Sequence, residues 1–84
     1  MAKVSVYTME YCPYCMMAKR LLTRRGIEFE EILVPDDDEA QWNALYTRSG
    51  MRTMPQIYHG ERLIGGYQEL SILDGQDQLA SLKT

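Results

Sequence analysis

The chain has few cysteines for disulfide bonds and no long apolar segment that could hold it in a membrane. Only two of its 84 residues are cysteines, and both lie in one four-residue window. A bridge between them would close a very small loop and would restrain the unfolded chain little. No stretch approaches the roughly 18 apolar residues of a membrane span, and the N-terminus lacks the apolar segment of a signal peptide. We therefore expect a cytoplasmic protein, with no membrane partner, whose fold depends on its apolar core.

Basic residues are also scarce. Nine Lys and Arg face twelve Asp and Glu, which gives a net charge of −3 and argues against nucleic acid as a partner. The charges are nevertheless clustered along the chain. The cations are Lys19, Arg20, Arg24 and Arg25, and the acids are Glu28, Glu30, Glu31, Asp36, Asp37, Asp38 and Glu39. Two solvated faces explain this pattern most simply. The alternative is a dipolar surface that orients protein partners.

The hydrophobic pattern predicts one α/β domain over residues 1–84, since a chain this short has room for no more. Strands are expected at residues 3–8, 27–34, 56–59 and 62–65. The last two flank Gly60-Glu61, a pair typical of a tight hairpin. Helices are expected from the cysteine window to Gly26, from the aspartates to Gly50, and over residues 67–82 with an interruption at Gly75. Right-handed crossovers then give a four-stranded mixed sheet in the order β-α-β-α-β-β-α, flanked by helices.

The second of these helices should begin at the aspartates that follow Pro35, because aspartate is a favoured N-cap. Side chains at helical spacing predict one buried stripe along it, formed by Trp42, Leu45, Tyr46 and Ser49.

The cysteines belong to the tetrad Cys12-Pro13-Tyr14-Cys15, which falls where the first strand leads into the first helix. Cys12 is then at the helix N-terminus, where unpaired N–H groups and the helix dipole stabilise a thiolate. Pro13 suits the first helical turn because it has no N–H to lose. Cys15 lies one turn further on the same face. We expect Cys12 to be an exposed nucleophile and Cys15 a more buried resolving thiol that attacks a mixed disulfide at Cys12.

Three other interpretations of the pair are open. A structural zinc site takes four ligands, but only Cys12, Cys15 and His59 are obvious candidates, so no metal is expected. Two inert buried cysteines are disfavoured by their place at a strand end before an amphipathic helix. The third interpretation is a dimer that bridges an iron–sulfur cluster through Cys12 of two chains and external thiols.

With this tetrad and two later segments, the sequence resembles the glutaredoxins, in particular the dithiol type of bacteria. The tetrad matches their active-site motif. Thr53-Met54-Pro55-Gln56-Ile57 resembles their Thr-Val-Pro segment, and Gly65-Gly66-Tyr67-Gln68-Glu69-Leu70 resembles their Gly-Gly-x-x-Asp/Glu-Leu segment. The three motifs keep the family's order, and the likeness runs essentially end to end. The resemblance implies a thioredoxin-like fold and glutathione as the reducing co-substrate.

The resemblance also implies which residues surround glutathione. Pro55 would be a cis proline opposite the cysteines, so that the Met54 backbone pairs with the cysteine part of glutathione. The N-terminus of the last helix would hold the glutamyl carboxylate. The implied glutathione contacts are Tyr14, Thr53, Met54, Pro55, Gly66, Tyr67 and Gln68.

Two positions depart from the family pattern. Met9 stands where many members carry a lysine, and Gln68 stands where an acid often receives the amino group of the ligand. A contact with glutathione that loses its charged partner is weakened by about 1 kcal/mol, which lowers the affinity several-fold. We therefore expect the departures to affect glutathione affinity rather than the redox chemistry.

The function implied is glutathione-dependent reduction of protein disulfides and glutathione mixed disulfides by a monomer. Its partners would be glutathione and disulfide-containing or glutathionylated proteins, with ribonucleotide reductase as one candidate. One alternative is a redoxin that serves ribonucleotide reductase and is recharged by thioredoxin reductase. The other is the iron–sulfur dimer, against which Pro13 argues because family members with this tetrad are usually poor cluster binders.

Overall fold

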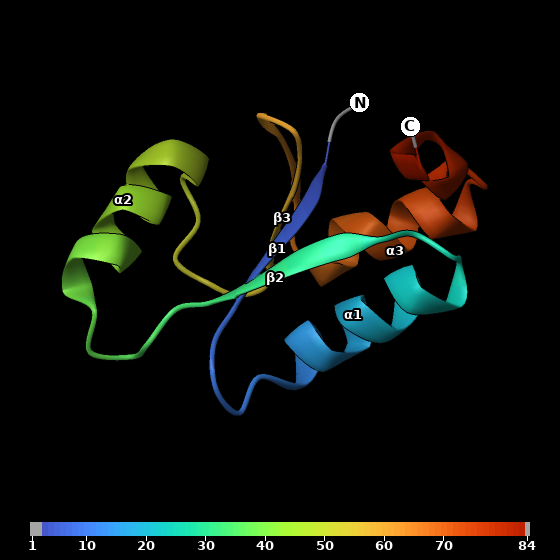
Figure 1. Cartoon of the computed structure of the whole chain (residues 1–84). Coiled ribbons are helices and arrows are strands. Elements are labelled where there is room, and N and C mark those ends of the chain that lie inside the picture. Colours follow the sequence, from blue (N-terminus) through green and yellow to red (C-terminus); the bar gives the residue numbers. More distant parts are fainter. Residues whose placement is uncertain (1–2, 84) are drawn as a thin grey trace.

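The computed structural model describes residues 3–83, so residues 1–2 and 84 of the predicted domain lie outside the described residues. The described chain forms four strands, three α-helices and a short 3₁₀ helix (Figure 1). In chain order they are β1 (Val4–Thr8), α1 (Pro13–Arg24), β2 (Phe29–Leu33), α2 (Glu39–Ser49), β3 (Gln56–His59), β4 (Arg62–Gly65), α3 (Tyr67–Gly75) and η1 (Leu79–Lys83). The predicted order of elements is confirmed. None of the helices in this part of the chain is long and apolar enough to span a bilayer.

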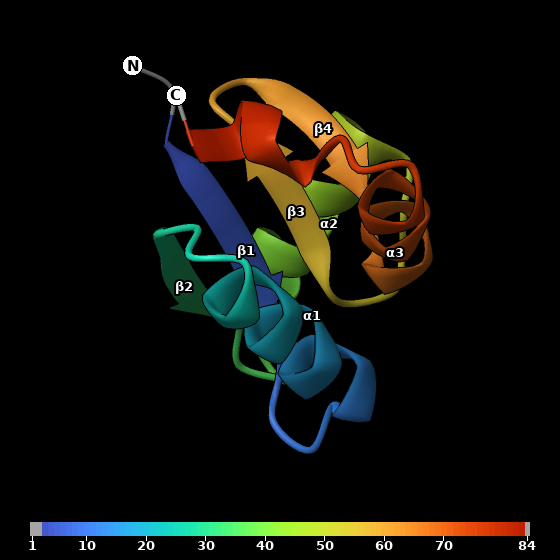
Figure 2. The same ribbon diagram turned by 90° about the vertical axis from the view of Figure 1, so that its right-hand side faces the viewer.

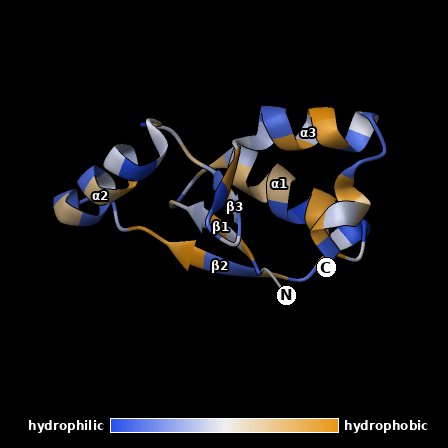
Figure 3. Ribbon diagram, turned by 90° about the horizontal axis from the view of Figure 1, so that it is seen from above, coloured by the Kyte–Doolittle hydropathy of each residue, from blue (hydrophilic) through white to orange (hydrophobic). Residues whose placement is uncertain are grey.

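The strands form one mixed sheet in the order β2-β1-β3-β4. The pair β1 and β2 is parallel, as the predicted crossover requires, whereas β3 is antiparallel to both β1 and β4. Helices α1 and α3 lie side by side on one face of the sheet, and α2 lies on the other (Figures 1 and 3). Because β1 is central, the loop that leaves its C-terminal end is placed between these two layers.

Helix α1 follows from its sequence. Cys12 is its N-cap and Pro13 its first residue, where a missing N–H costs nothing. Its buried side chains recur at helical spacing and face the sheet: Cys15, Ala18, Leu21 and Leu22. The helix ends at Arg24, and Gly26 then adopts a φ of +73°, which glycine tolerates without a steric penalty.

Two hydrophobic clusters hold the layers together. The larger one joins the sheet to α1, α3 and η1, and includes Val6, Leu22, Ile57, Leu70 and Leu79. The smaller one contains both cysteines with Val34, Leu45 and Met54. The second cluster connects the start of α1 with the exit of β2, with α2 and with the loop before β3. The cysteines are therefore part of the packing that joins these elements.

The buried stripe predicted for α2 is wrong in part. Leu45 is buried and Trp42 and Ser49 are half-buried, but Tyr46 is 40% exposed. Among the described helices, α2 lies alone on its face of the sheet, with no second helix beside it, so more of its surface meets solvent (Figures 1 and 3). The Tyr46 ring instead supports the Arg52 guanidinium, whose carbon lies 4.1 Å from the ring centroid. The predicted caps are confirmed: Asp38 accepts the Gln41 N–H, and Gly50 ends the helix.

The last helical region divides where the sequence predicts an interruption. Helix α3 ends at Gly75, and Asp77 adopts a φ of +58° that no helix can continue. The remaining turn is the 3₁₀ helix η1, which returns Leu79 and Leu82 to the core. Figure 2 shows η1 lying across the sheet beside α3.

Candidate active site

The tetrad forms the start of α1: Cys12 is the N-cap, and the other three residues are the first of the helix. Cys12 has an extended backbone, with φ −109° and ψ 101°, and its Sγ accepts the backbone N–H of Cys15 at 3.3 Å. This is the position in which an N-cap serine or aspartate would accept a first-turn N–H. The sulfur therefore takes the place of a capping oxygen at the positive end of the helix dipole, where negative charge is stabilised.

The predicted exposure of Cys12 is wrong. Cys12 is 5% exposed and Cys15 is 2% exposed, and both are free thiols. The cause is the loop before β3: the Cys12 thiol donates to the carbonyl oxygen of Met54 at 3.7 Å, and Met54 packs in the same cluster. The loop before β3 therefore covers Cys12, and a disulfide must reach its sulfur beside Met54.

Cys15 has a different electrostatic setting. Burial, followed by its hydrogen bond with Cys12, raises the pKa of the Cys15 thiol from 9.0 to about 12. A hydrogen bond from the Met9 backbone and the charge of Lys19 act in the opposite direction but do not outweigh burial. Near neutral pH Cys15 therefore keeps its proton.

Two distant segments meet the tetrad. The Met54–Pro55 peptide bond is cis, as the resemblance implied, and the Met54 carbonyl faces Cys12. A Cβ placed on Gly66 would lie 3.4 Å from the Pro55 oxygen, so the start of α3 is directly beside this bond. The Tyr14 ring lies 6.2 Å from the Tyr67 ring, centroid to centroid. The three sequence motifs thus converge on one surface.

The remaining predicted residues lie at the edge of that surface. Thr53 and Gln68 are exposed, and no hydrogen bond or ion pair among residues 3–83 joins either side chain to a cysteine. Met9 is half-buried and packs against the cluster that contains both thiols. Its place near the sulfurs is therefore apolar rather than charged.

Sequence reasoning missed two residues that hold this surface in shape. The buried Gln56 amide donates to the carbonyls of Met51 at 3.1 Å and Thr53 at 3.2 Å, which fixes the loop before Pro55. Glu69 accepts the Gly66 N–H at 2.7 Å and so caps α3. The three-residue spacing of Gly66 and Glu69 matches half of a capping box and could have indicated this contact. Gln56 carries no such signal, because its partners depend on the tertiary path of the loop.

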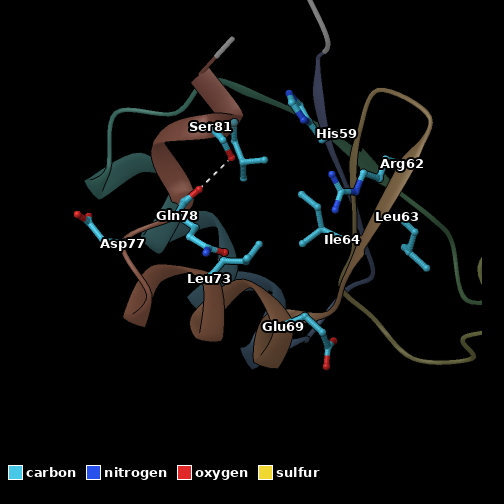
Figure 4. A pocket seen from close by; sticks show the side chains of 10 residues that line it. His59, Arg62, Leu63, Ile64, Glu69, Leu73, Asp77, Gln78 and Ser81 are labelled. Carbon is cyan, nitrogen blue, oxygen red and sulfur yellow. Dashed lines mark hydrogen bonds between the residues drawn. The ribbon is translucent and has the colours of Figure 1, made fainter.

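The described structure offers no metal site, and it contains a cavity that the cysteines do not line. Between residues 3 and 83, no three His, Cys, Asp or Glu side chains are grouped so that they could hold a metal ion. A cavity of about 500 Å³ lies between β4, α3 and η1, lined by residues that include Arg62, Leu73 and Gln78 (Figure 4). Neither cysteine lines it.

Comparison with known proteins agrees with this geometry. Residues 4–64 match the sequence model of the glutaredoxin family. The chain belongs to the glutaredoxin family. It is 42% identical to Glutaredoxin 3 of Escherichia coli strain K12, over 98% of each chain. It is 40% identical to a probable glutaredoxin of Synechocystis sp., over 96% of this chain and 92% of that protein.

Solved glutaredoxin structures share the fold. A buckwheat glutaredoxin–glutathione complex superposes with a TM-score of 0.87 at 26% identity, covering 96% of this chain and 76% of that one. Glutaredoxin from Brucella melitensis gives a TM-score of 0.84 at 40% identity, covering 98% and 88%. The fold is therefore thioredoxin-like, as the resemblance implied. Membership of this family, together with the Cys12 and Cys15 pair, makes the chain a thiol–disulfide oxidoreductase.

Proposed function

We propose that this glutaredoxin uses glutathione to reduce glutathione mixed disulfides and protein disulfides, with Cys12 as nucleophile and Cys15 as resolving thiol. The observation that carries the proposal is the unequal setting of the two thiols. Cys12 Sγ accepts a first-turn N–H of α1, whereas burial raises the pKa of Cys15 to about 12. Further support comes from the family, which uses glutathione as reductant, and from the buckwheat relative in complex with glutathione.

The surface around Cys12 offers complementary groups for glutathione. The backbone of Met54 can pair with the cysteine part of the tripeptide, with Thr53 and Pro55 shaping that edge. Gly66 is the N-cap of α3, and the first backbone N–H groups of this helix, beside Gln68, can donate to the glutamyl carboxylate. The rings of Tyr14 and Tyr67 line the side nearest α1.

Deglutathionylation then needs Cys12 alone. Its thiolate attacks the glutathione sulfur of a protein–glutathione disulfide; the Cys12–glutathione bond forms, the original S–S bond breaks, and the protein thiolate leaves and takes a proton. The thiolate of a second glutathione attacks the glutathione sulfur held by Cys12. Glutathione disulfide leaves, and the Cys12 thiolate is restored. The two electrons that reduce the protein sulfur of the mixed disulfide to a thiol come from the oxidation of glutathione to its disulfide.

Protein disulfides need Cys15 as well. Cys12 first attacks the substrate disulfide, whose S–S bond breaks as one substrate thiolate leaves and a mixed disulfide with Cys12 forms. Cys15 must then lose its proton to attack the Cys12 sulfur, which forms the Cys12–Cys15 disulfide and releases the second substrate thiolate. Two glutathione molecules then reduce the Cys12–Cys15 disulfide and leave as glutathione disulfide. Two of the causes that raise the Cys15 pKa are a hydrogen bond and a charge contributed by Cys12. A Cys12 sulfur in a disulfide carries no charge, so Cys15 becomes easier to ionise at the step that uses it.

The choice of reductant tests this proposal. We expect the pure protein to reduce 2-hydroxyethyl disulfide with glutathione, glutathione reductase and NADPH, measured as NADPH consumption. The matched reaction contains thioredoxin reductase and NADPH without glutathione and should show no turnover. If only thioredoxin reductase supported turnover, glutathione would not be the donor. As part of this proposal we place the protein in the reducing cytoplasm, where glutathione keeps such a pair reduced.

A further inference from the structure

One side of α1 is exposed along its whole length and starts at Pro13, directly after Cys12. Pro13, Met17, Arg20 and Arg24 are all exposed and follow one another at spacings of four, three and four residues. These spacings place them on one face of the helix. Among the described elements none covers this side of α1, which faces away from the sheet (Figures 1 and 2). We call these four residues the α1 strip.

The end of the α1 strip nearest Cys12 is apolar. Met17 is 41% exposed, and the neighbouring Met16 and Tyr14 are 51% and 60% exposed. Large apolar side chains rarely gather on a surface that meets only water, whereas single exposed ones are common. Here they lie within five residues of the buried Cys12, so a substrate bound along this end of α1 can place an apolar side chain against them.

The far end of the α1 strip is positive and unpaired. The ion pairs among residues 3–83 are Lys3–Glu30, Lys19–Glu31 and Arg25–Asp74. Arg20 and Arg24 take part in none of them, and α1 contains no acidic residue. The chain as a whole has a net charge of −3, so this patch stands out against an acidic protein. Its charge complements a negative partner.

We propose that the α1 strip docks an acidic segment of the substrate protein, with its carboxylates on Arg20 and Arg24 and an apolar side chain on Met17. This proposal rests on the proposed exchange at Cys12. Arg20 and Arg24 lie about 12 Å and about 18 Å along the helix axis from Cys12. An extended chain advances about 3.3 Å per residue, so the carboxylates belong about four to six residues from the reacting cysteine.

Single-turnover kinetics with peptides test the strip. Reduced protein, without free glutathione, is mixed with glutathionylated peptides that differ only in carrying Glu or Gln at the fourth to sixth residues from the cysteine. Separate peptides place these residues on either side of the cysteine. We expect at least one Glu peptide to react about three- to ten-fold faster than its Gln counterpart at low salt, with the preference lost at high salt.

The variants localise the effect. In Arg20→Glu/Arg24→Glu the Glu preference should disappear or reverse, and Arg20→Gln/Arg24→Gln should abolish it without adding negative charge. The matched control, Lys3→Glu/Arg62→Glu, makes the same change of net charge at two exposed positions that are not on α1, one before β1 and one at the start of β4, and should keep the preference. All rates are normalised to the rate of the same variant with 2-hydroxyethyl disulfide.

Two results would overturn the docking proposal: equal rates for Glu and Gln peptides with the unaltered protein, or an equal loss of preference in the Lys3→Glu/Arg62→Glu control. The second result would mean that net charge, not the α1 strip, steers the substrate. Failure of the proposed function has a different signature, since the protein would then react with neither peptide nor with 2-hydroxyethyl disulfide.

Discussion

The two thiols of this glutaredoxin are close in sequence but differ in what surrounds each sulfur. Cys12 receives a backbone N–H at the start of α1 and donates to the Met54 carbonyl. Cys15 lies deeper among apolar side chains, and burial is the largest cause of its raised pKa. The difference therefore arises from the helix terminus and the loop before β3 rather than from the residue types.

Alkaline pH should reveal the setting of Cys15. Its pKa is about 12 in the folded protein against 9.0 for a free thiol, so below pH 9.0 both folded and unfolded states keep the proton. Between these values only the folded state keeps it, and the free energy of unfolding must fall as pH rises. Urea denaturation of the reduced protein across this range should show the fall. Cys15→Ser should show a smaller fall, and identical slopes in the two proteins would contradict the burial of the thiol proton.

Gln68 is the residue through which we expect glutathione affinity to be tuned. Gln68→Asp places a carboxylate at the start of α3, where it suits the helix dipole and can receive the amino group of glutathione. We expect the KM for glutathione to fall about five-fold, which corresponds to roughly 1 kcal/mol. Gln78→Asp adds the same charge away from the site and should leave the KM unchanged. If the KM for glutathione were unchanged in Gln68→Asp, the side chain at position 68 would not contact glutathione, and the prediction would be wrong.

At the scale of elements, the active surface depends on where α3 begins. Gly65 adopts a φ of +129°, and a Cβ placed on it would lie 2.7 Å from Glu69 Cγ. Glu69 in turn holds the Gly66 N–H, and Gly66 packs beside Pro55. The turn from β4 into α3 thus links the end of the sheet to the loop that faces Cys12.

Gly65→Ala should therefore destabilise the protein. The new methyl group clashes with Glu69 and the backbone is strained, so we expect a loss of about 1–3 kcal/mol in unfolding free energy and a higher KM for glutathione. Gly75→Ala is the matched control, because a Cβ there meets nothing within 4 Å. It should be neutral or stabilising by up to about 1 kcal/mol. Equal stability of the two variants, measured by chemical denaturation, would show that Gly65 is not constrained.

The strands and helices were the part of the fold that the sequence predicted best. Alternation, helical spacing and caps such as Asp38 and Gly50 are local signals, and the mixed sheet follows from them. Burial was harder to predict. Tyr46 has the spacing of a buried residue but is exposed on a helix that no other described helix covers, and Cys12 is covered by the loop that contains the distant residue Met54. Such contacts depend on tertiary position, which no local pattern contains.

At the scale of the whole molecule, the site and the core are continuous. The cluster of Cys12, Cys15, Val34, Leu45 and Met54 joins α1, the exit of β2, α2 and the loop before β3. In a chain of 84 residues this cluster is a substantial part of the apolar packing. The three motifs that the resemblance singled out meet on its surface, although residues 16–64, more than half the chain, separate the first from the last. Their meeting could be inferred only through the family, because spacing alone does not bring distant segments together.

The turnover of the two single cysteine variants tests the division of labour between the thiols most directly. With a glutathionylated peptide, glutathione, glutathione reductase and NADPH, Cys15→Ser should retain deglutathionylation, because that exchange uses Cys12 alone. Cys12→Ser should be inactive, because Cys15 stays protonated and buried. Circular dichroism of both variants confirms that each is folded. Sustained turnover by folded Cys12→Ser would contradict the account.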